Sequence, residues 1–248
     1  MPDIVISNEG PVRKIRMNRP EKKNALTLAM YETMAAAIED AGTQPSVRCL
    51  LLAGAPDVFC AGNDLNDFVA MARSGALGAS IVRFLHVLAR CEKPLVAAVS
   101  GAAVGIGTTM LLHCDQVIAS DNAVLLTPFV SLGLLPEAGS SLIAPRLMGH
   151  ARAFSLLVMG KPLSATDARA VGIVNAVVSA AELDAQSLAT ARDIAALPPE
   201  SVATARRLMR GSVEEVVARI DEEVEAFRVR LASPEAQAAL AAFLNRKR

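Results

Sequence analysis

Two hydrophobic patterns alternate along the chain, and each predicts one kind of element. Short apolar or alternating segments predict strands at 4–6, 12–17, 47–53, 95–99, 117–119, 124–126 and 173–178. Apolar residues three and four positions apart predict helices at about 28–38, 64–71, 81–89, 106–113, 141–148, 151–159 and 165–170. Thr27 is a candidate N-cap for the first of these helices. Since strands separated by helices favour parallel sheets, the pattern predicts an α/β fold.

The last quarter of the chain has a different pattern. From residue 180 onward the apolar spacing is helical throughout. In residues 213–231 one apolar face is formed by Val216, Val217, Ile220, Val224, Phe227 and Leu231. The pattern therefore predicts an α/β core followed by a helical region.

Composition excludes several classes of protein. The 248 residues are 52% hydrophobic, which is enough for a large core and excludes a disordered chain. Lys and Arg total 25 against 25 Asp and Glu, so no net charge favours nucleic acid or an anionic membrane. The longest apolar run, about 95–112, is short and interrupted for a spanning helix. With no signal-peptide pattern at the start, we expect a cytoplasmic protein.

Cysteines and histidines show no metal-binding or disulfide pattern. The cysteines are Cys49, Cys60, Cys91 and Cys114, and no two form a C-x-x-C pair. The histidines are His86, His113 and His150, which are far apart in sequence. We expect the cysteines to be free, buried thiols and the histidines to be surface or core residues, with no metal site.

A glycine-rich segment, GAAVGIG at residues 101–107, follows one predicted strand. Met110 stands where a dinucleotide-binding fingerprint needs glycine, and Ile106 follows Gly105 where a phosphate-binding P-loop needs lysine. Two interpretations remain open. The glycines permit a tight, closely packed turn, or they let free backbone N–H groups at a helix start face negative charge.

Glu137 is the acidic residue in the most apolar surroundings, within the segment LLPEAGSS. If that loop packs inward, loss of water raises the pKa of the carboxyl and makes it a better base near neutral pH. The alternative is that Glu137 caps the helix that begins near Ser140 or faces solvent. The local sequence leaves both open.

Five sequence blocks resemble the crotonase (enoyl-CoA hydratase/isomerase) superfamily, in order along almost the whole chain. They are NRPEKKNAL at 18–26, FCAGNDL at 59–65, KPLVAAVSGAAVG at 93–105, CDQVIAS at 114–120 and ARAVGIV at 168–174. The resemblance implies a spiral of ββα turns at residues 1–195, which forms the core and carries the active site, with residues 196–248 as a helical trimerisation region. It also implies acyl-CoA thioester substrates and a homotrimer or a dimer of trimers.

The shared chemistry of that superfamily is an enolate-like anion held by two backbone N–H groups, which match Asn63 and Ile106 here. Donors fixed before the reaction stabilise the charge that develops on the thioester oxygen. The hydratases have two glutamates at the positions of Thr109 and Phe129, and neither of these residues transfers protons. Glu137 instead matches the catalytic base of the peroxisomal-type Δ3,Δ2-enoyl-CoA isomerases.

The resemblance also predicts which residues contact the acyl-CoA. They are Lys22, Lys23, Asn24, Ala25, Leu26, Ala61, Gly62, Asp64, Leu65, Val104, Gly105, Phe129 and Leu132. The basic tail at 246–248 either lies near the CoA phosphates or is simply solvated. Coenzyme A belongs to the substrate, so we expect no separate cofactor and no nucleic-acid or membrane partner.

The leading hypothesis is an isomerase that converts 3-enoyl-CoA to 2-enoyl-CoA, with Glu137 as its single base. One alternative is another crotonase-fold enzyme that performs hydration or other enolate chemistry on a different acyl-CoA. The other is a non-catalytic acyl-CoA-binding member. An apolar site for an idle carboxylate costs free energy, which disfavours this last alternative.

Overall fold

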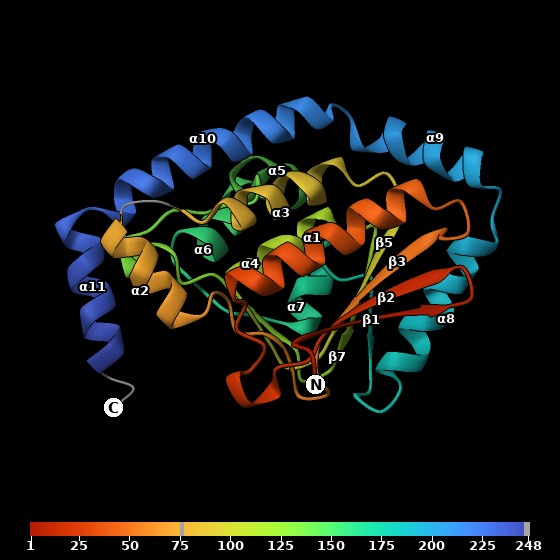
Figure 1. Cartoon of the computed structure of the whole chain (residues 1–248), viewed down its shortest axis with the longest axis horizontal. Coiled ribbons are helices and arrows are strands. Elements are labelled where there is room, and N and C mark those ends of the chain that lie inside the picture. The colour runs from red at the N-terminus through yellow and green to blue at the C-terminus, as the bar shows by residue number, and fades with distance from the viewer. Residues whose placement is uncertain (75–76, 246–248) are drawn as a thin grey trace.

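The computed structural model describes residues 1–74 and 77–245, which form two sheets covered by helices (Figure 1). The strands of the larger sheet, in spatial order, are β1 (Ile4–Glu9), β2 (Val12–Met17), β3 (Cys49–Ala53), β5 (Leu95–Val99), β7 (Gln116–Ser120) and β10 (Ala176–Val178). The smaller sheet contains β4 (Val58–Cys60), β6 (Ala102–Val104), β8 (Val124–Leu126) and β9 (Leu163–Ser164). β1 and β9 pair antiparallel with their neighbours, and the remaining pairs are parallel, as predicted.

The chain winds through these sheets in ββα turns. Each central strand of the larger sheet is followed by a strand of the smaller sheet and then by helices. Thus β3 and β4 lead to α2 (Leu65–Ser74) and α3 (Ala79–Arg90), and β5 and β6 lead to α4 (Ile106–Thr109) and the 3-10 turn η2 (Met110–His113). Strands β7 and β8 lead through η3 (Val130–Leu132) to α5 (Ser140–Met148) and α6 (His150–Leu157). Equivalent loops of successive turns therefore lie next to one another.

The continuous apolar runs of the central strands are explained by burial of both faces of the larger sheet. In β3, Leu50 and Leu52 face the main core under α1 (Leu28–Thr43) and α3. The alternate residues face a second core under α8 (Leu183–Ala196). The predicted N-cap of α1 is confirmed, because the Thr27 side chain accepts a hydrogen bond from the Met30 N–H.

The C-terminal helices pack on the core of their own chain. They are α9 (Pro199–Arg210), α10 (Val213–Leu231) and α11 (Pro234–Asn245), and α7 (Ala165–Ala170) precedes them in the core. Figure 1 shows α10 lying along the side of α3 and α5, with α11 at the end that carries α2. Phe227 of α10 meets Phe68 of α2 edge-to-face, with ring centroids 6.3 Å apart. No helix within the described ranges is both long and apolar enough to cross a membrane.

Two local predictions were wrong. Residues 101–107 are more than a turn, because they contain the short strand β6 between Gly101 and Gly105, both at positive φ. Three residues are too few for a periodic pattern to reveal. The strand predicted at 173–178 begins only at Ala176, because the N–H groups of Ile173 and Val174 bond to Ala168 at the end of α7 instead of joining the sheet.

The expectation of free thiols is confirmed. All the cysteines are unpaired, and Cys114 alone among them is partly exposed rather than buried.

Candidate active site

A cavity of about 180 Å³ opens where the β4–α2 loop, the start of α4 and the η3 segment meet. Its lining includes nine of the predicted site residues: Ala61, Gly62, Asn63, Leu65, Val104, Gly105, Ile106, Phe129 and Leu132. It also includes six that the sequence analysis did not single out for the site: Phe68, Pro128, Ser131, Leu134, Phe227 and Leu240. The wall is thus mostly apolar, as expected for the acyl chain that the resemblance implies, and α10 and α11 close one side of it.

Two backbone N–H groups in this wall have no protein acceptor among the described residues. Leu26 pairs with the residues on both sides of Asn63: its N–H donates to the carbonyl oxygen of Gly62, and its carbonyl oxygen accepts from the Asp64 N–H. This pairing leaves the Asn63 N–H free. Ile106 is the first residue of α4, so its N–H has no partner within the helix. A free N–H group donates a hydrogen bond to an anion or a carbonyl oxygen, so two of them in one cavity are able to stabilise a negative charge on a bound ligand.

Glycines bring the two donor segments close together. Gly105, at φ 57° and ψ −119°, turns the chain from β6 into α4 with a backbone conformation that other residues avoid. A Cβ on Gly107 would lie 2.7 Å from the carbonyl oxygen of Cys60, so the start of α4 packs directly on the end of β4. The glycine-rich segment therefore serves both purposes left open by the sequence, because it packs tightly and presents a free N–H.

Tyr31 of α1 holds the Asn63 segment in place through a side-chain hydrogen bond. Its hydroxyl donates a 2.6 Å hydrogen bond to Oδ1 of Asn63, and its ring packs edge-to-face on Phe84. The side chain is buried, and burial together with the nearby Glu137 and Cys60 raises the pKa of Tyr31 well above its usual range. Tyr31 therefore stays protonated and available as a donor. Sequence analysis placed it only in the helical stripe of the core.

Replacing Tyr31 with phenylalanine is expected to lower the free energy of unfolding by about 1 kcal/mol, because one hydrogen bond is lost while ring packing is kept. Since the bond also fixes the Asn63 loop, turnover of the expected acyl-CoA substrate should fall with it. Denaturant titration and steady-state kinetics measure the two effects. Unchanged turnover would show that Tyr31 supports the fold alone.

Glu137 follows the η3 segment and is partly buried behind α4. It is not among the residues that line the cavity, but its Oε1 accepts a 2.5 Å hydrogen bond from Thr109, one turn along the helix from the Ile106 donor. Removal from water, and to a smaller degree the charge of Glu223, raises the pKa of Glu137 to about 8, although the Thr109 bond opposes this. The carboxyl is therefore a stronger base than ordinary glutamate.

Glu137 does not cap the following helix, so that alternative is excluded. The N-cap of α5 is Gly139, which has no capping side chain, and the carboxylate at this helix start is Glu223 of α10. The sequence could not show this, because Glu223 is 84 residues from Gly139.

The predicted CoA-binding loop is divided between structural and exposed residues. Asn24 is fully buried and donates to the carbonyl oxygens of the β4 residues Val58 and Phe59. Asp64 is buried and forms a 2.7 Å ion pair with Arg19. The side chains of Asn24 and Asp64 thus hold the loop in place.

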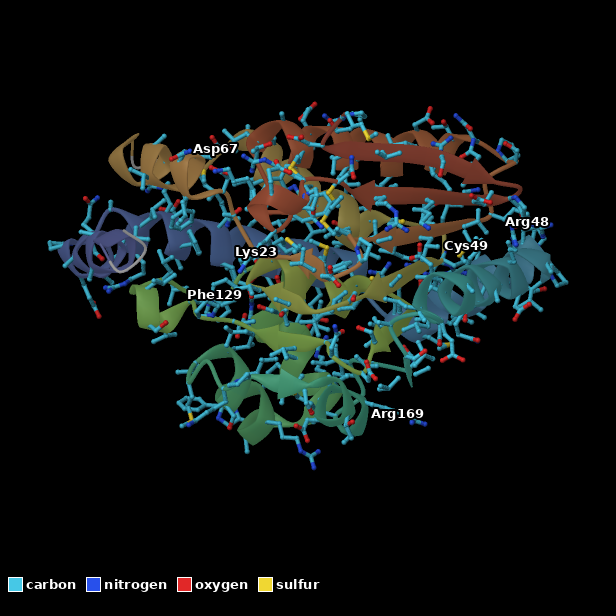
Figure 2. All side chains as sticks on the ribbon, turned by 90° about the horizontal axis from the view of Figure 1, so that it is seen from below. Lys23, Arg48, Cys49, Asp67, Phe129 and Arg169 are labelled. Carbon is cyan, nitrogen blue, oxygen red and sulfur yellow. The ribbon has the colours of Figure 1, made fainter. Side chains whose placement is uncertain are left out.

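The lysines of this loop remain free to face a ligand. Lys22 and Lys23 are exposed, and the carbonyl oxygen of Lys23 binds the Ala61 N–H beside the cavity. Figure 2 shows the labelled Lys23 and Phe129 in the same half of the molecule as Asp67 of α2, whereas Arg48 and Cys49 lie in the other half. Ala25 is partly buried and Leu26 is buried, and the basic tail at 246–248 lies outside the described residues.

Comparison with known proteins decides the family. A model described as enoyl-CoA hydratase/isomerase matches residues 7–248. The chain belongs to this family. The predicted crotonase-type fold is confirmed by a solved structure of OdaA from Pseudomonas aeruginosa, which is 43% identical, with a TM-score of 0.94 and 98% and 99% of the two chains covered.

Curated members of the family have different activities in their names. Enoyl-CoA delta isomerase 2 of Rattus norvegicus is 38% identical over 98% of this chain, which spans 64% of that protein's length. Enoyl-CoA delta isomerase 3, peroxisomal, of Mus musculus is 35% identical, with 99% and 79% covered. The 1,2-epoxyphenylacetyl-CoA isomerase of Escherichia coli K12 is 37% identical, with 80% and 78% covered. The family is therefore shown, and the reaction has to be argued from the site.

Proposed function

We propose that the protein isomerises 3-enoyl-CoA to 2-enoyl-CoA, with Glu137 as the single base. One observation carries the proposal: a carboxyl group whose pKa is raised to about 8 is bonded to the helix whose first N–H is free in the cavity. Base and anion-stabilising donor are therefore fixed to the same short helix. Relatives named enoyl-CoA delta isomerases support the same reaction.

In the proposed mechanism, the thioester oxygen of the substrate accepts hydrogen bonds from the N–H groups of Asn63 and Ile106. These donors acidify the C2 protons, because the negative charge that forms on deprotonation moves to that oxygen. Glu137 removes a C2 proton to give a dienolate and then returns the proton at C4, so no atom is gained or lost. Thr109 binds one carboxylate oxygen and leaves the other for the substrate.

Hydration is disfavoured by the residues that stand in place of the hydratase glutamates. The Thr109 hydroxyl is engaged by Glu137, so it does not activate water. Phe129 is 7% exposed and forms part of the apolar cavity wall. Exclusion of water from the intermediate favours return of the proton over addition of hydroxide.

The rate should depend on pH through Glu137. A base works only when ionised, so kcat/KM for 3-enoyl-CoA is expected to rise with pH and level off above a pKa of about 8. A pH–rate profile of the wild-type enzyme measures this. A midpoint near the ordinary glutamate pKa would mean that Glu137 is not the group that limits activity.

One incubation tests the whole proposal. The protein is given a 3-enoyl-CoA in heavy water, and mass spectrometry reads the double-bond position, added water and deuterium in the product. A 2-enoyl product without added water is expected. Added water would show a hydratase, whereas deuterium at C2 without a shifted bond would indicate enolate chemistry on another acyl-CoA. Tight acyl-CoA binding with no exchange would favour the non-catalytic alternative.

Assembly and location belong to the same proposal. We expect an acyl-CoA as the ligand, no separate cofactor, and a homotrimer or a dimer of trimers. Exposed apolar side chains on and after α5 and α6, namely Leu147, Phe154 and Met159, support self-association. A trimerisation role for residues 196–248 and a cytoplasmic location stay predictions.

A further inference from the structure

We propose that Glu223 of α10 is a positioning residue for Glu137, because it clamps the peptide unit that follows this base. The inference rests on the proposed function in one respect, namely that Glu137 is the base. Among the described residues, Glu223 does not line the cavity and makes no hydrogen bond to Glu137. Its effect on catalysis would therefore be exerted through the turn at 137–141.

The contacts of Glu223 are those of a clamp. The side chain is 7% exposed, although it lies in the middle of a long helix that is otherwise largely polar on its outer face. Its Oε2 accepts a 2.6 Å hydrogen bond from the Gly139 N–H. Its Oε1 accepts bonds of 2.9 Å and 2.5 Å from the N–H and hydroxyl of Ser141. Both oxygens are thus bound to the first turn of α5, where a negative charge is favoured.

The clamped turn has an unusual backbone. Ala138 and Gly139, the two residues directly after Glu137, have φ values of 64° and 68°. A residue with a Cβ, such as Ala138, adopts this left-handed conformation only when its surroundings impose it. The direction of the Glu137 side chain therefore depends on contacts that hold these two residues.

The same peptide unit is held at its other end. His113 lies 2.7 Å through Nε2 from the carbonyl oxygen of Ala138, and a carbonyl only accepts, so Nε2 carries the proton. Burial lowers the pKa of His113 to about 4, which keeps the ring neutral. The Ala138 C=O and the Gly139 N–H belong to one peptide group, which His113 and Glu223 hold from its two ends. A flip of this peptide would break both contacts, so Glu137 is kept in one position.

Glu223 also acts on Glu137 by its charge. Three titratable groups interact electrostatically with this carboxyl. Its charge raises the pKa of Tyr31 from α1 and of Cys60 from β4, and the charge of Glu223 from α10 raises the pKa of Glu137. Burial raises the pKa of Tyr31 and of Cys60, so both stay neutral. Burial also raises the pKa of Glu223, but the hydrogen bonds that it accepts from Ser141 and Gly139 oppose this and favour its ionised form. Arg219 donates to Ser141 on the Glu223 side and partly offsets its charge. Removing the Glu223 charge should therefore make Glu137 a weaker base.

The test is the substitution Glu223→Gln, which keeps the shape of the side chain but removes its charge. It also places an amide NH2 group, which is a donor, next to a backbone N–H that needs an acceptor. We expect kcat for 3-enoyl-CoA to fall about tenfold, with KM changed less than about twofold, because the base is misplaced while substrate binding is kept. We also expect the midpoint of the kcat/KM profile to move to lower pH. The matched control is Glu215→Gln, which removes another contact between α10 and α5, the exposed ion pair with Arg146, and should leave both readouts unchanged.

A second variant separates the effect of Glu223 on the position of Glu137 from the effect of its charge. It also keeps the proposal testable if Glu223→Gln fails to fold. Glu223→Asp keeps the negative charge but is one methylene too short to reach both donors, so kcat should fall while the pH midpoint stays. A merely structural role would lower the melting temperature of these variants and leave kcat per active site and the pH profile as in the wild type. That result in both variants would overturn the proposal.

Failure of the proposed function is distinguishable from failure of this inference. If the wild-type protein does not isomerise 3-enoyl-CoA, the Glu137 carboxyl is still observable by carbon NMR, assigned by comparison with Glu137→Gln. Its titration midpoint is expected at lower pH in Glu223→Gln than in the wild type. An unchanged midpoint would overturn the proposed coupling whatever the reaction is.

Discussion

Replacing Glu137 with glutamine is expected to lower kcat by about 100-fold to 10,000-fold, the usual contribution of a general base. The amide has the same shape and can still accept the Thr109 hydrogen bond, but it takes no proton from C2. Binding of the acyl-CoA should be retained, because the free N–H groups of Asn63 and Ile106 are untouched. Steady-state kinetics and calorimetric titration with the 2-enoyl product measure the two quantities.

The same variant should be more stable than the wild type at alkaline pH. The folded state holds the proton of Glu137 up to a pKa of about 8, against 4.5 for an ordinary glutamate. The folded protein therefore binds more protons than the unfolded chain between these values, and stability falls as pH rises through that window. Glutamine has no such dependence, so the gain in melting temperature should be larger at pH 8 than at pH 5.

Glu182→Gln is the matched control for both effects, since Glu182 is an exposed glutamate with no connection to the cavity. It should keep the activity of the wild type and show no gain in melting temperature at pH 8. Retention of full activity by the Glu137 variant would remove this residue from the mechanism and return the choice to other enolate chemistry.

Replacing Gly107 with alanine is expected to lower kcat by about 100-fold to 1,000-fold, the loss seen when one oxyanion donor is removed. The new methyl group would lie 2.7 Å from the carbonyl oxygen and 2.9 Å from the Cβ of Cys60. Neither neighbour is the free end of a flexible side chain, so the start of α4 has to move away from β4. That movement shifts the Ile106 N–H away from the Asn63 N–H, so the two donors no longer face the same oxygen.

Gly42 provides the control, because it is also a helical glycine without positive φ, but a Cβ added to it would have nothing within 4 Å. Gly42→Ala should leave kcat unchanged and increase stability by up to about 1 kcal/mol. Kinetics and thermal unfolding of both variants compare the two sites. A Gly107→Ala enzyme with normal kcat would show that close packing of the two segments is not needed for the reaction.

The sequence was informative where chemistry is local. The block containing Asn63 and the turn before Ile106 can both be found in short segments, and the structure places them in one cavity. These two features depend on neighbours along the chain, so they are visible before the fold is known. For Glu137 the local sequence left open whether the carboxyl is removed from water or caps the next helix, and the structure decides for removal from water, which raises its pKa.

Contacts between distant segments could not be predicted in this way. Tyr31 reads as one more core residue of an amphipathic helix, although it bonds to Asn63, 32 positions later. Glu223 reads as one of many acidic residues of a polar helix, although it binds the turn beside Glu137. Phe227 and Leu240 reach the cavity only because α10 and α11 fold back over it. Only the three-dimensional arrangement gives these residues their role.

The bond between Tyr31 and Asn63 has an optical consequence. The chain has no tryptophan and one tyrosine, so its tyrosine fluorescence comes from a single side chain beside the proposed oxyanion site. Occupation of that site by a thioester should change the surroundings of the phenol and therefore its fluorescence. A pantetheine thioester, which lacks the absorbing adenine, would then allow binding to be followed in the unlabelled protein, one signal per subunit.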